Sequence, residues 1–255
     1  MIHFLIPLRS KAASKDWQRV CRQFNRTLES CYRQTCGDFR ILVACHDLPT
    51  LNEHYDQRVE FLQVHTPTPT NTTEMMLDKG YKMHRLMQRG RELLNTTNGG
   101  GYFLPVDADD LVSNRLAAFF AHRDDQRCYT SRFGYIWQSG SRYLTKAKDL
   151  WRTCGSCTVI YYTPDELPAT DFEHKDPARK FIFQVSHRDL PAYARSLGKT
   201  FATIPFPSTV YVLGTGENHS LLIGRGMSWK RTVEGLLRVP RLINEEKRKE
   251  YNLIL

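Results

Sequence analysis

The sequence predicts an α/β fold, in which a mostly parallel sheet is flanked by helices and followed by a smaller mixed region. Three observations support this prediction. Apolar runs such as "IHFLIPL" and "FRILVAC" are typical of strands that are buried on both faces. These runs alternate with stretches of helical periodicity in the order strand, helix, strand, strand, helix, strand. The chain of 255 residues, 41% of them hydrophobic, is also long enough to bury one large core.

The first half of the chain contains the most regular elements. After the opening strand, residues 16–36 repeat apolar side chains every three or four positions and predict a helix, which Ser14 or Asp16 can cap and Gly37 can end. Strands follow in "FRILVAC" and "VEFLQV", then a second helix over about residues 74–94, a triple-glycine turn and the strand "YFLPV". This half should therefore form the parallel part of the sheet.

The second half mixes short elements. "NRLAAFFAHR" predicts a short helix, "RCYTSRFGYIWQSG" with "SRYLTKA" a β-hairpin, and "GSCTVIYYTPDELP" a strand that leads into a turn. A helix is expected from about Ser186 to Gly198, and "FATIPFPSTVYVLG" contains two short strands. We therefore divide the chain into residues 1–110, residues 111–224 of the same domain, and a basic amphipathic tail over residues 225–255.

Polar clusters follow three of the predicted strands. Arg9, Asp47 and the acids of residues 107–110 all stand where an apolar run ends. In parallel sheets, ligands gather at the carboxyl ends of the strands, so these side chains should share one edge. Close carboxylates raise one another's pKa unless a cation compensates. Asp107 and Asp109 form a D-x-D motif that can hold Mg²⁺ or Mn²⁺ together with oxygens of a substrate diphosphate; the alternative is an acidic helix start, the role that suits Asp110.

Other candidates are less tied to a pattern. His219 follows two glycines in "GTGENHS" and either supplies an imidazole to the same metal or is an ordinary loop histidine. Lys79, Lys82 and Arg85 are three residues apart on one helix face, which either reaches a phosphate or is a solvated basic face.

For a general base, the sequence offers two main candidates. His187 and Asp189 stand at the predicted start of a helix, where side chains project toward a strand-end cleft. Asp165, Glu166 and Asp171 in the preceding turn region are rivals.

Apolar runs and cysteine usage indicate the cellular compartment. No apolar run approaches the ~20 residues of a membrane-spanning helix, and "MIHFLIPLRS" predicts a strand rather than a signal peptide. The cysteine count of seven is odd, and the C-x-x-C pair Cys154 and Cys157 has no second pair to complete a zinc site, so packing roles are favoured. We therefore expect a cytoplasmic protein.

The net charge of +9 favours polyanionic partners: nucleic acid, an anionic membrane surface or phosphorylated small molecules. Between Arg225 and Glu250, eight Lys and Arg residues against four acids supply +4 of this charge. A basic nucleic-acid-binding domain without catalysis is thus one alternative, although the sequence contains no recognisable helix-turn-helix, zinc-finger or RNA-recognition motif.

The motifs together resemble the GT-A-fold nucleotide-sugar glycosyltransferases, in particular the inverting, family-2-like group. The matching stretches are "FLIPLRS", "CYRQT", "FRILVACHD", "YFLPVDADDLV" and "GKTFATIPFPSTVYVLGTGENHS", and the resemblance covers about residues 1–220. It implies a GT-A-type, Rossmann-like sheet. Residues 1–110 would be the nucleotide-sugar-binding half and residues 111–224 the acceptor-binding and catalytic half.

The resemblance also implies roles for individual residues. The nucleoside pocket would be lined by Pro7, Leu8, Arg9 and Asp47. Asp107, Ala108 and Asp109 would meet the ribose and the metal. Lys79 and Lys82 would serve the diphosphate, and Gly155 and Ser156 the acceptor side. Asp109 and His219 would ligate the metal. "HRD" at residues 187–189 stands where this group often has a Glu-Asp pair, so either Asp189 or His187 would be the base and the stereochemistry stays open.

These inferences predict a metal-dependent glycosyltransferase of the hexosyltransferase type, acting in polysaccharide biosynthesis. It would move a sugar from a UDP- or GDP-linked donor to a hydroxyl of a glycan or lipid-linked acceptor, with Mn²⁺ or Mg²⁺ as cofactor and no nucleic acid. The tail would order over the diphosphate, lie on the anionic inner face of the membrane, or pack as an ordinary terminal helix. A sugar-phosphate nucleotidyltransferase is a further alternative, but "PLRSKAASKDW" lacks the glycine-rich phosphate loop that it would prefer.

Overall fold

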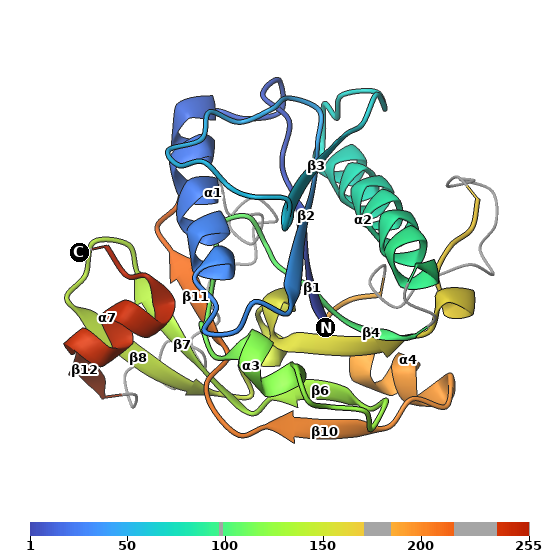
Figure 1. Cartoon of the computed structure of the whole chain (residues 1–255). Helices are drawn as coiled ribbons and strands as arrows, with labels where there is room; N and C mark the ends of the chain where they lie inside the picture. Colours follow the sequence, from blue (N-terminus) through green and yellow to red (C-terminus); the bar gives the residue numbers. More distant parts are fainter. Residues whose placement is uncertain (97–98, 171–184, 217–238, 255) are drawn as a thin grey trace.

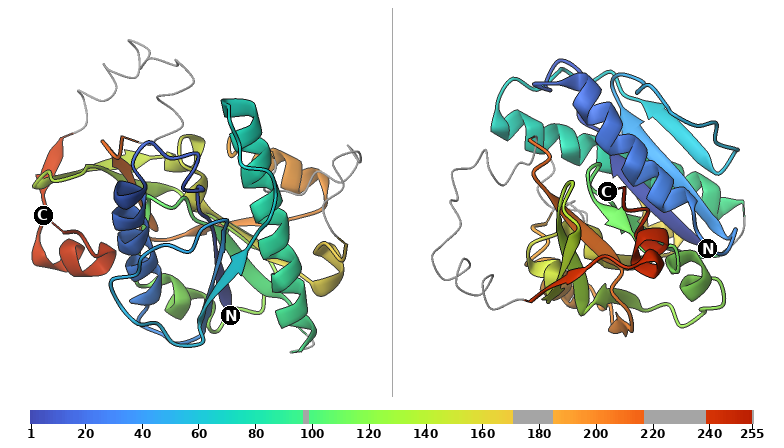
Figure 2. Two further views of the ribbon diagram at one scale, coloured as in Figure 1. Left: turned by 90° about the horizontal axis from the view of Figure 1, so that it is seen from above. Right: turned by 90° about the vertical axis from the view of Figure 1, so that its left-hand side faces the viewer.

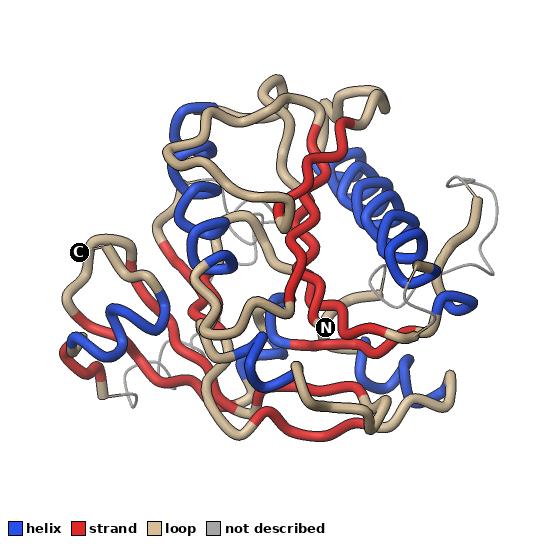
Figure 3. Tube along the Cα trace, viewed as in Figure 1, coloured by secondary structure: helices blue, strands red, loops and turns tan. Residues whose placement is uncertain are grey.

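The computed structural model describes residues 1–96, 99–170, 185–216 and 239–254, which form two sheets with helices packed around them (Figures 1 and 3). The larger sheet has seven described strands in the order β10-β6-β9-β4-β1-β2-β3. Their bounds are β1 Ile2–Pro7, β2 Phe39–Cys45, β3 Val59–Gln63, β4 Gly101–Pro105, β6 Cys128–Ser131, β9 Thr158–Tyr162 and β10 Phe201–Ile204. Within this sheet β9 runs antiparallel to both neighbours, and the other pairs are parallel. The predicted α/β class with a mostly parallel, helix-flanked sheet is confirmed.

Helices cover both faces of this sheet because its strands are apolar on both sides. Helix α1 (Trp17–Tyr32) begins where the Asp16 carboxylate accepts a hydrogen bond from the Arg19 backbone N–H at 2.9 Å. Along β1, Phe4 belongs to the core under α1, whereas Leu5 belongs to the core under α2 (Thr72–Asn95). Figure 2 shows the strands lying between the two helices. Strand alternation thus places successive residues in different cores.

The second sheet is the smaller mixed region that the sequence predicts. Its described strands follow the order β12-β8-β7-β11-β5. Their bounds are β5 Leu111–Val112, β7 Phe133–Gln138, β8 Tyr143–Lys148, β11 Thr209–Leu213 and β12 Pro240–Leu242. The expected hairpin is present as β7–β8, and β11 pairs in parallel with β7 and antiparallel with β5. β4 of the larger sheet and β5 of the second sheet are separated by the acids of residues 107–110, which we call the acidic segment. This segment therefore connects the two sheets.

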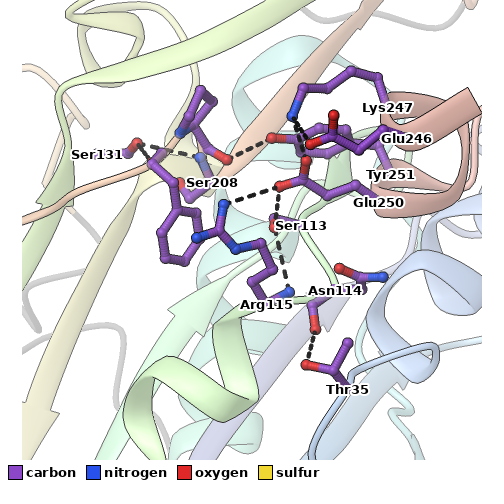
Figure 4. A network of polar contacts seen from close by, with 12 residues as sticks. Thr35, Ser113, Asn114, Arg115, Ser131, Ser208, Glu246, Lys247, Glu250 and Tyr251 are labelled. Carbon is purple, nitrogen blue, oxygen red and sulfur yellow. Dashed lines mark hydrogen bonds and ion pairs between the residues drawn. The ribbon is translucent and has the colours of Figure 1, made fainter. Parts of the chain in front are cut away.

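A terminal helix, α7 (Glu245–Tyr251), packs against the second sheet through a polar network (Figure 4). Glu250 is 7% exposed and accepts a hydrogen bond from the Ser113 hydroxyl at 2.8 Å. The Tyr251 ring is fully buried, and its hydroxyl donates to the Pro207 carbonyl at 2.6 Å. Satisfied polar groups on a buried helix face fix the helix in one place.

Of the predicted tail, the structure describes residues 239–254, and packing against the second sheet is shown for the end of α7, at Glu250 and Tyr251. Residues 225–238 and 255 lie outside the described residues, so contact of the tail with a membrane or with the diphosphate stays a prediction. Within the described part of the chain, no helix is both long and apolar enough to cross a bilayer.

One of the shorter helices begins later than the sequence predicts. The helix expected from Ser186 is α4 (Leu190–Ser196), so His187 and Asp189 lie in the turn before it. Pro191 at the first turn fits a later start, because proline is tolerated there and not further in. The other short elements are α3 Leu116–Phe120, η1 Leu150–Arg152, η2 Gly155–Cys157 and η3 Pro164–Glu166. All the cysteines are free thiols, and all but Cys36 are buried, as packing roles require.

Candidate functional site

The acidic segment forms a turn at the carboxyl edge of the larger sheet. β4 ends at Pro105, and the Asp110 backbone N–H then donates to the Asp107 carbonyl at 2.9 Å, which reverses the chain. Asp107, Ala108 and Asp109 are partly exposed, whereas Asp110 is completely buried. The turn therefore presents the D-x-D carboxylates outward and the third one inward.

Asp107 is paired with Lys79 from α2. The Lys79 Nζ contacts Asp107 Oδ1, and the two side chains are 43% and 36% exposed. Burial opposes the charge of Lys79, but Asp107 and the neighbouring acids more than offset this effect and raise the pKa of Lys79. Lys79 therefore lies at the acidic segment, and the contact with a phosphate that the sequence suggested for it stays a prediction.

Lys82, one turn further along α2, lies elsewhere. Its side chain is 1% exposed, and its Nζ donates to Asp78 Oδ2 at 2.6 Å. Burial lowers the pKa of Lys82, although Asp78 opposes the shift. Arg85 is partly exposed and lies 3.9 Å from Glu92. In this structure the three basic residues therefore have different partners, and Lys79 is the one that contacts the acidic segment, residues 107–110.

Asp109 is held by the loop that follows β11. The Thr215 hydroxyl donates to Asp109 Oδ2 at 3.1 Å. This loop is fixed from α1, because the Gln23 amide donates to the Thr215 carbonyl at 2.7 Å and the Arg19 guanidinium donates to the Gly214 carbonyl at 3.4 Å. Burial, together with the charge of Asp107, raises the pKa of Asp109 to about 6.

Asp110 joins three segments inside the protein. Its Oδ2 accepts hydrogen bonds from the Ser156 hydroxyl at 2.7 Å and the Cys154 thiol at 3.1 Å, and its Oδ1 accepts one from the Val212 N–H at 3.3 Å. Burial, then the neighbouring Cys154 and Asp109, raises the pKa of Asp110. Sequence reasoning assigned Asp110 only a helix-start role; the signal for a buried role was its position directly before the apolar pair Leu111 and Val112.

Gly155 and Ser156 lie beside Asp107. The Ser156 hydroxyl accepts the Asp107 backbone N–H at 3.0 Å, and a Cβ added to Gly155 would lie 3.8 Å from Asp107 Oδ2. The family resemblance implied an acceptor-side role for both residues; the structure places them beside Asp107 with the Ser156 side chain fully buried, and contact with an acceptor stays a prediction.

The loops after β1 and β2 meet at the same edge. Asp47 Oδ2 accepts the Lys11 backbone N–H at 2.8 Å, which ties the two loops together. Pro7, Arg9 and Asp47 are partly exposed, but the Leu8 side chain is fully buried in the core, so a ligand would meet Leu8 only through its backbone. Parallel pairing of β1 with β2 and β4 makes this edge common to all three loops.

The two candidate bases have different surroundings. The His187 Nε2 lies 3.0 Å from the Arg152 carbonyl, and burial lowers the pKa of His187 while the nearby charge of Asp107 opposes this shift. Asp189 is exposed and makes no side-chain capping bond to α4. The charges of Asp107 and Lys79 both act on His187.

The described acids at this edge fit a divalent cation that is shared with a substrate. In the described ranges, no three His, Cys, Asp or Glu side chains form a metal-binding group, and the predicted ligand His219 lies outside those ranges, as does Asp171. Mg²⁺ is usually held by one or two carboxylates together with substrate phosphates, a requirement that Asp107 and Asp109 fit. A cation would also offset the charge that burial and Asp107 disfavour at Asp109.

Comparisons with known proteins give structural similarity alone. No protein-family model and no curated protein matches the chain. Residues 1–349 of TarS from S. aureus, in complex with UDP-GlcNAc, are 11% identical, with a TM-score of 0.47 and coverage of 83% of this chain and 58% of that one. The same TarS fragment in another structure is 12% identical (TM-score 0.44, coverage 83% and 60%), and a longer TarS chain is 11% identical (TM-score 0.43, coverage 83% and 36%). This chain thus spans less than two thirds of each TarS chain.

Proposed function

We propose that this protein is a glycosyltransferase that moves a sugar from a nucleotide-diphosphate sugar to a hydroxyl of a glycan or lipid-linked acceptor. One observation carries the proposal. Two partly exposed carboxylates, Asp107 and Asp109, stand at the carboxyl edge of the parallel strands β4, β1 and β2, together with the loops after β1 and β2 and the ammonium of Lys79. This is the edge at which parallel α/β sheets bind nucleotides.

The donor half of the site follows from these positions. Asp47, held by the Lys11 backbone, is the acceptor available to a nucleoside, and Lys79 is the cation available to a phosphate. Asp107 and Asp109 would hold Mn²⁺ or Mg²⁺, which when bound supplies Lewis-acid stabilisation to a departing diphosphate. Lys79 would then exchange its contact with Asp107 for one with the diphosphate.

The acceptor side would be formed by the second sheet. A groove of about 490 Å³ on this sheet is lined in part by Gln138, Tyr143 and Leu213. Leu213 is followed by Gly214 and Thr215, so the groove begins beside the loop that contacts Asp109. Its mixture of apolar side chains with amide and hydroxyl groups suits a saccharide that must be oriented through its hydroxyls.

His187 is the residue that we assign as general base. A carbonyl at 3.0 Å from Nε2 fixes the proton on that nitrogen, which leaves the lone pair on Nδ1, and a lowered pKa keeps the imidazole neutral near pH 7. We expect His187→Ala to reduce the rate of sugar transfer by about 100-fold while nucleotide binding is retained, because general bases contribute 10²–10⁴-fold.

Steady-state kinetics of this variant and of Asp189→Asn would check the assignment. Asp189→Asn should transfer sugar at a nearly wild-type rate, and the wild-type rate should fall only below pH 6.5. A large loss in Asp189→Asn with none in His187→Ala would reverse the assignment.

The proposed function is tested by thermal stabilisation against nucleoside diphosphates and nucleotide sugars, with and without Mn²⁺. A ligand at 100 times its Kd adds about 2.7 kcal/mol to stability, so one member of the panel should raise the Tm clearly, and more so with Mn²⁺. If no nucleotide raises the Tm but unrelated duplexes bind with a steep dependence on salt, the basic nucleic-acid-binding alternative is correct instead.

A further inference from the structure

We propose that Asp110 is a positioning residue: it holds the backbone of Asp107 and the strand that leads to Thr215 in one fixed arrangement, so that the two outward carboxylates keep their relative geometry. What those carboxylates bind rests on the proposed function. The fixed arrangement itself rests only on contacts within the chain.

The first step is the chain of hydrogen bonds from Asp110 to Asp107. The Ser156 hydroxyl has a single proton and donates it to Asp110 Oδ2 at 2.7 Å, so its lone pairs are left to accept the Asp107 N–H at 3.0 Å. Both Asp110 and Ser156 are fully buried, which removes water as a competing partner. Asp110 thereby fixes the orientation of the hydroxyl that fixes Asp107.

The second step is the contact with β11. Asp110 Oδ1 accepts the Val212 N–H at 3.3 Å, and Thr215, three residues further on, donates to Asp109. The residues after Asp110 form β5, which pairs with the start of β11. The side chain of Asp110 therefore continues the attachment of β11 beyond the end of the short strand β5.

The third step concerns the chemistry of the side chain. Asp110 accepts from a hydroxyl, a thiol and a backbone N–H, and both of its oxygens are used. Asparagine has the same shape but one oxygen, and its NH₂ group is a donor. In Asp110→Asn, the amide NH₂ must face a donor, and at Ser156 it would compete with the Asp107 N–H for the hydroxyl oxygen.

Glu250 provides a matched control. It too is a buried acid, 7% exposed, that accepts a hydrogen bond from a serine hydroxyl, Ser113, at 2.8 Å. It anchors α7 through Ser113, Lys247 and Arg115, none of which belongs to the acidic segment (Figure 4). Glu250→Gln should therefore lower global stability through the same kind of change without altering Asp107.

The experiment measures amide hydrogen exchange by NMR in wild type, Asp110→Asn, Ser156→Ala and Glu250→Gln, with each rate corrected for the global stability of the variant. We expect the Asp107 amide to exchange at least about tenfold faster than in wild type in Asp110→Asn and Ser156→Ala, and at the wild-type rate in Glu250→Gln. Mn²⁺-dependent binding of UDP or GDP should weaken by about 10–100-fold in Asp110→Asn and Ser156→Ala, the usual cost of losing a group that orients a metal ligand.

The outcomes separate the two proposals. Equal Asp107 exchange in Asp110→Asn and Glu250→Gln overturns the positioning role, whatever the protein binds. If Asp110→Asn does not fold, the same comparison between Ser156→Ala and Glu250→Gln decides. If wild type binds neither nucleotide with Mn²⁺, the proposed function fails, and the exchange data still decide whether Asp110 positions Asp107.

Discussion

Replacing Asp109 with asparagine is expected to make the ligand-free protein more stable and to abolish its stabilisation by a nucleoside diphosphate with Mn²⁺. Asp109 is a partly buried carboxylate next to Asp107, and burial and this neighbour raise its pKa from 3.8 to about 6. The charged form is therefore the unfavourable one in the folded protein. Asparagine removes the charge and keeps an oxygen for the Thr215 hydroxyl.

The pH dependence follows from the direction of this shift. Because the folded pKa lies above the unfolded one, the folded state binds the proton more tightly, and wild-type stability falls as pH rises from about 3.8 to about 6. At 1.36 kcal/mol per pKa unit, the loss amounts to at most about 3 kcal/mol. Asp109→Asn should lack this loss, so its advantage over wild type should appear above pH 6 and vanish near pH 4.

Thermal denaturation of both proteins between pH 4 and 8, without and with Mn²⁺ and nucleotide, measures both effects. Asp165→Asn, at an exposed acid in the η3 turn, is the control for the substitution itself. An Asp109→Asn protein that is less stable than wild type at pH 8, or that still gains stability from Mn²⁺ with nucleotide, would contradict the role given to Asp109.

The parts of this site that the sequence predicts are those fixed by strand order. Buried apolar runs define the parallel strands, and pairing in parallel brings the residues after each strand to one edge. Asp107 and Asp47 are predictable in this way, because Asp107 directly follows such a run and Asp47 stands one residue beyond another. The sequence predicted a basic face on α2 but not the contact of Lys79 with Asp107. Helical spacing shows which residues share a face, and it does not show which residues that face contacts.

The remaining parts depend on contacts between residues far apart in sequence. Asp110 meets Ser156 and Val212, 46 and 102 positions away, and no local pattern specifies such a meeting. Likewise, whether His187 or Asp189 faces the acidic segment depends on where α4 begins, and the structure starts this helix at Leu190 rather than near Ser186. Tertiary packing, which local propensity does not encode, decides each of these positions.

Spacing along a helix does not show how deeply each residue is buried, and Lys82 is the clearest example. Lys79 and Lys82 are one helical turn apart, yet Lys79 is 43% exposed at the acidic segment, whereas Lys82 is 1% exposed and paired with Asp78. Removing one partner of a buried ion pair leaves a buried charge and costs about 3–5 kcal/mol. We therefore expect Asp78→Ala to lower the Tm by roughly 10 °C, since 1 kcal/mol corresponds to about 2–4 °C in a domain of this size.

Two further variants identify the cause. Lys79→Met breaks a partly exposed pair and should change stability by no more than about 1 kcal/mol. The double variant Asp78→Leu with Lys82→Met removes both buried charges and should recover most of the stability lost in Asp78→Ala. Urea denaturation of the three variants measures these differences, and a loss below about 1 kcal/mol in Asp78→Ala would refute the buried pair.

The same double variant tests the role that the family resemblance implied for Lys82. If Lys82 only satisfies Asp78, the double variant folds and binds a nucleoside diphosphate with Mn²⁺ as wild type does, whereas Lys79→Met binds it more weakly. If the double variant is stable but has lost nucleotide binding, Lys82 must leave Asp78 to reach the diphosphate. Such a movement would also explain why a lysine is buried one turn from the site, because a buried ion pair is weak evidence for a role in stability alone.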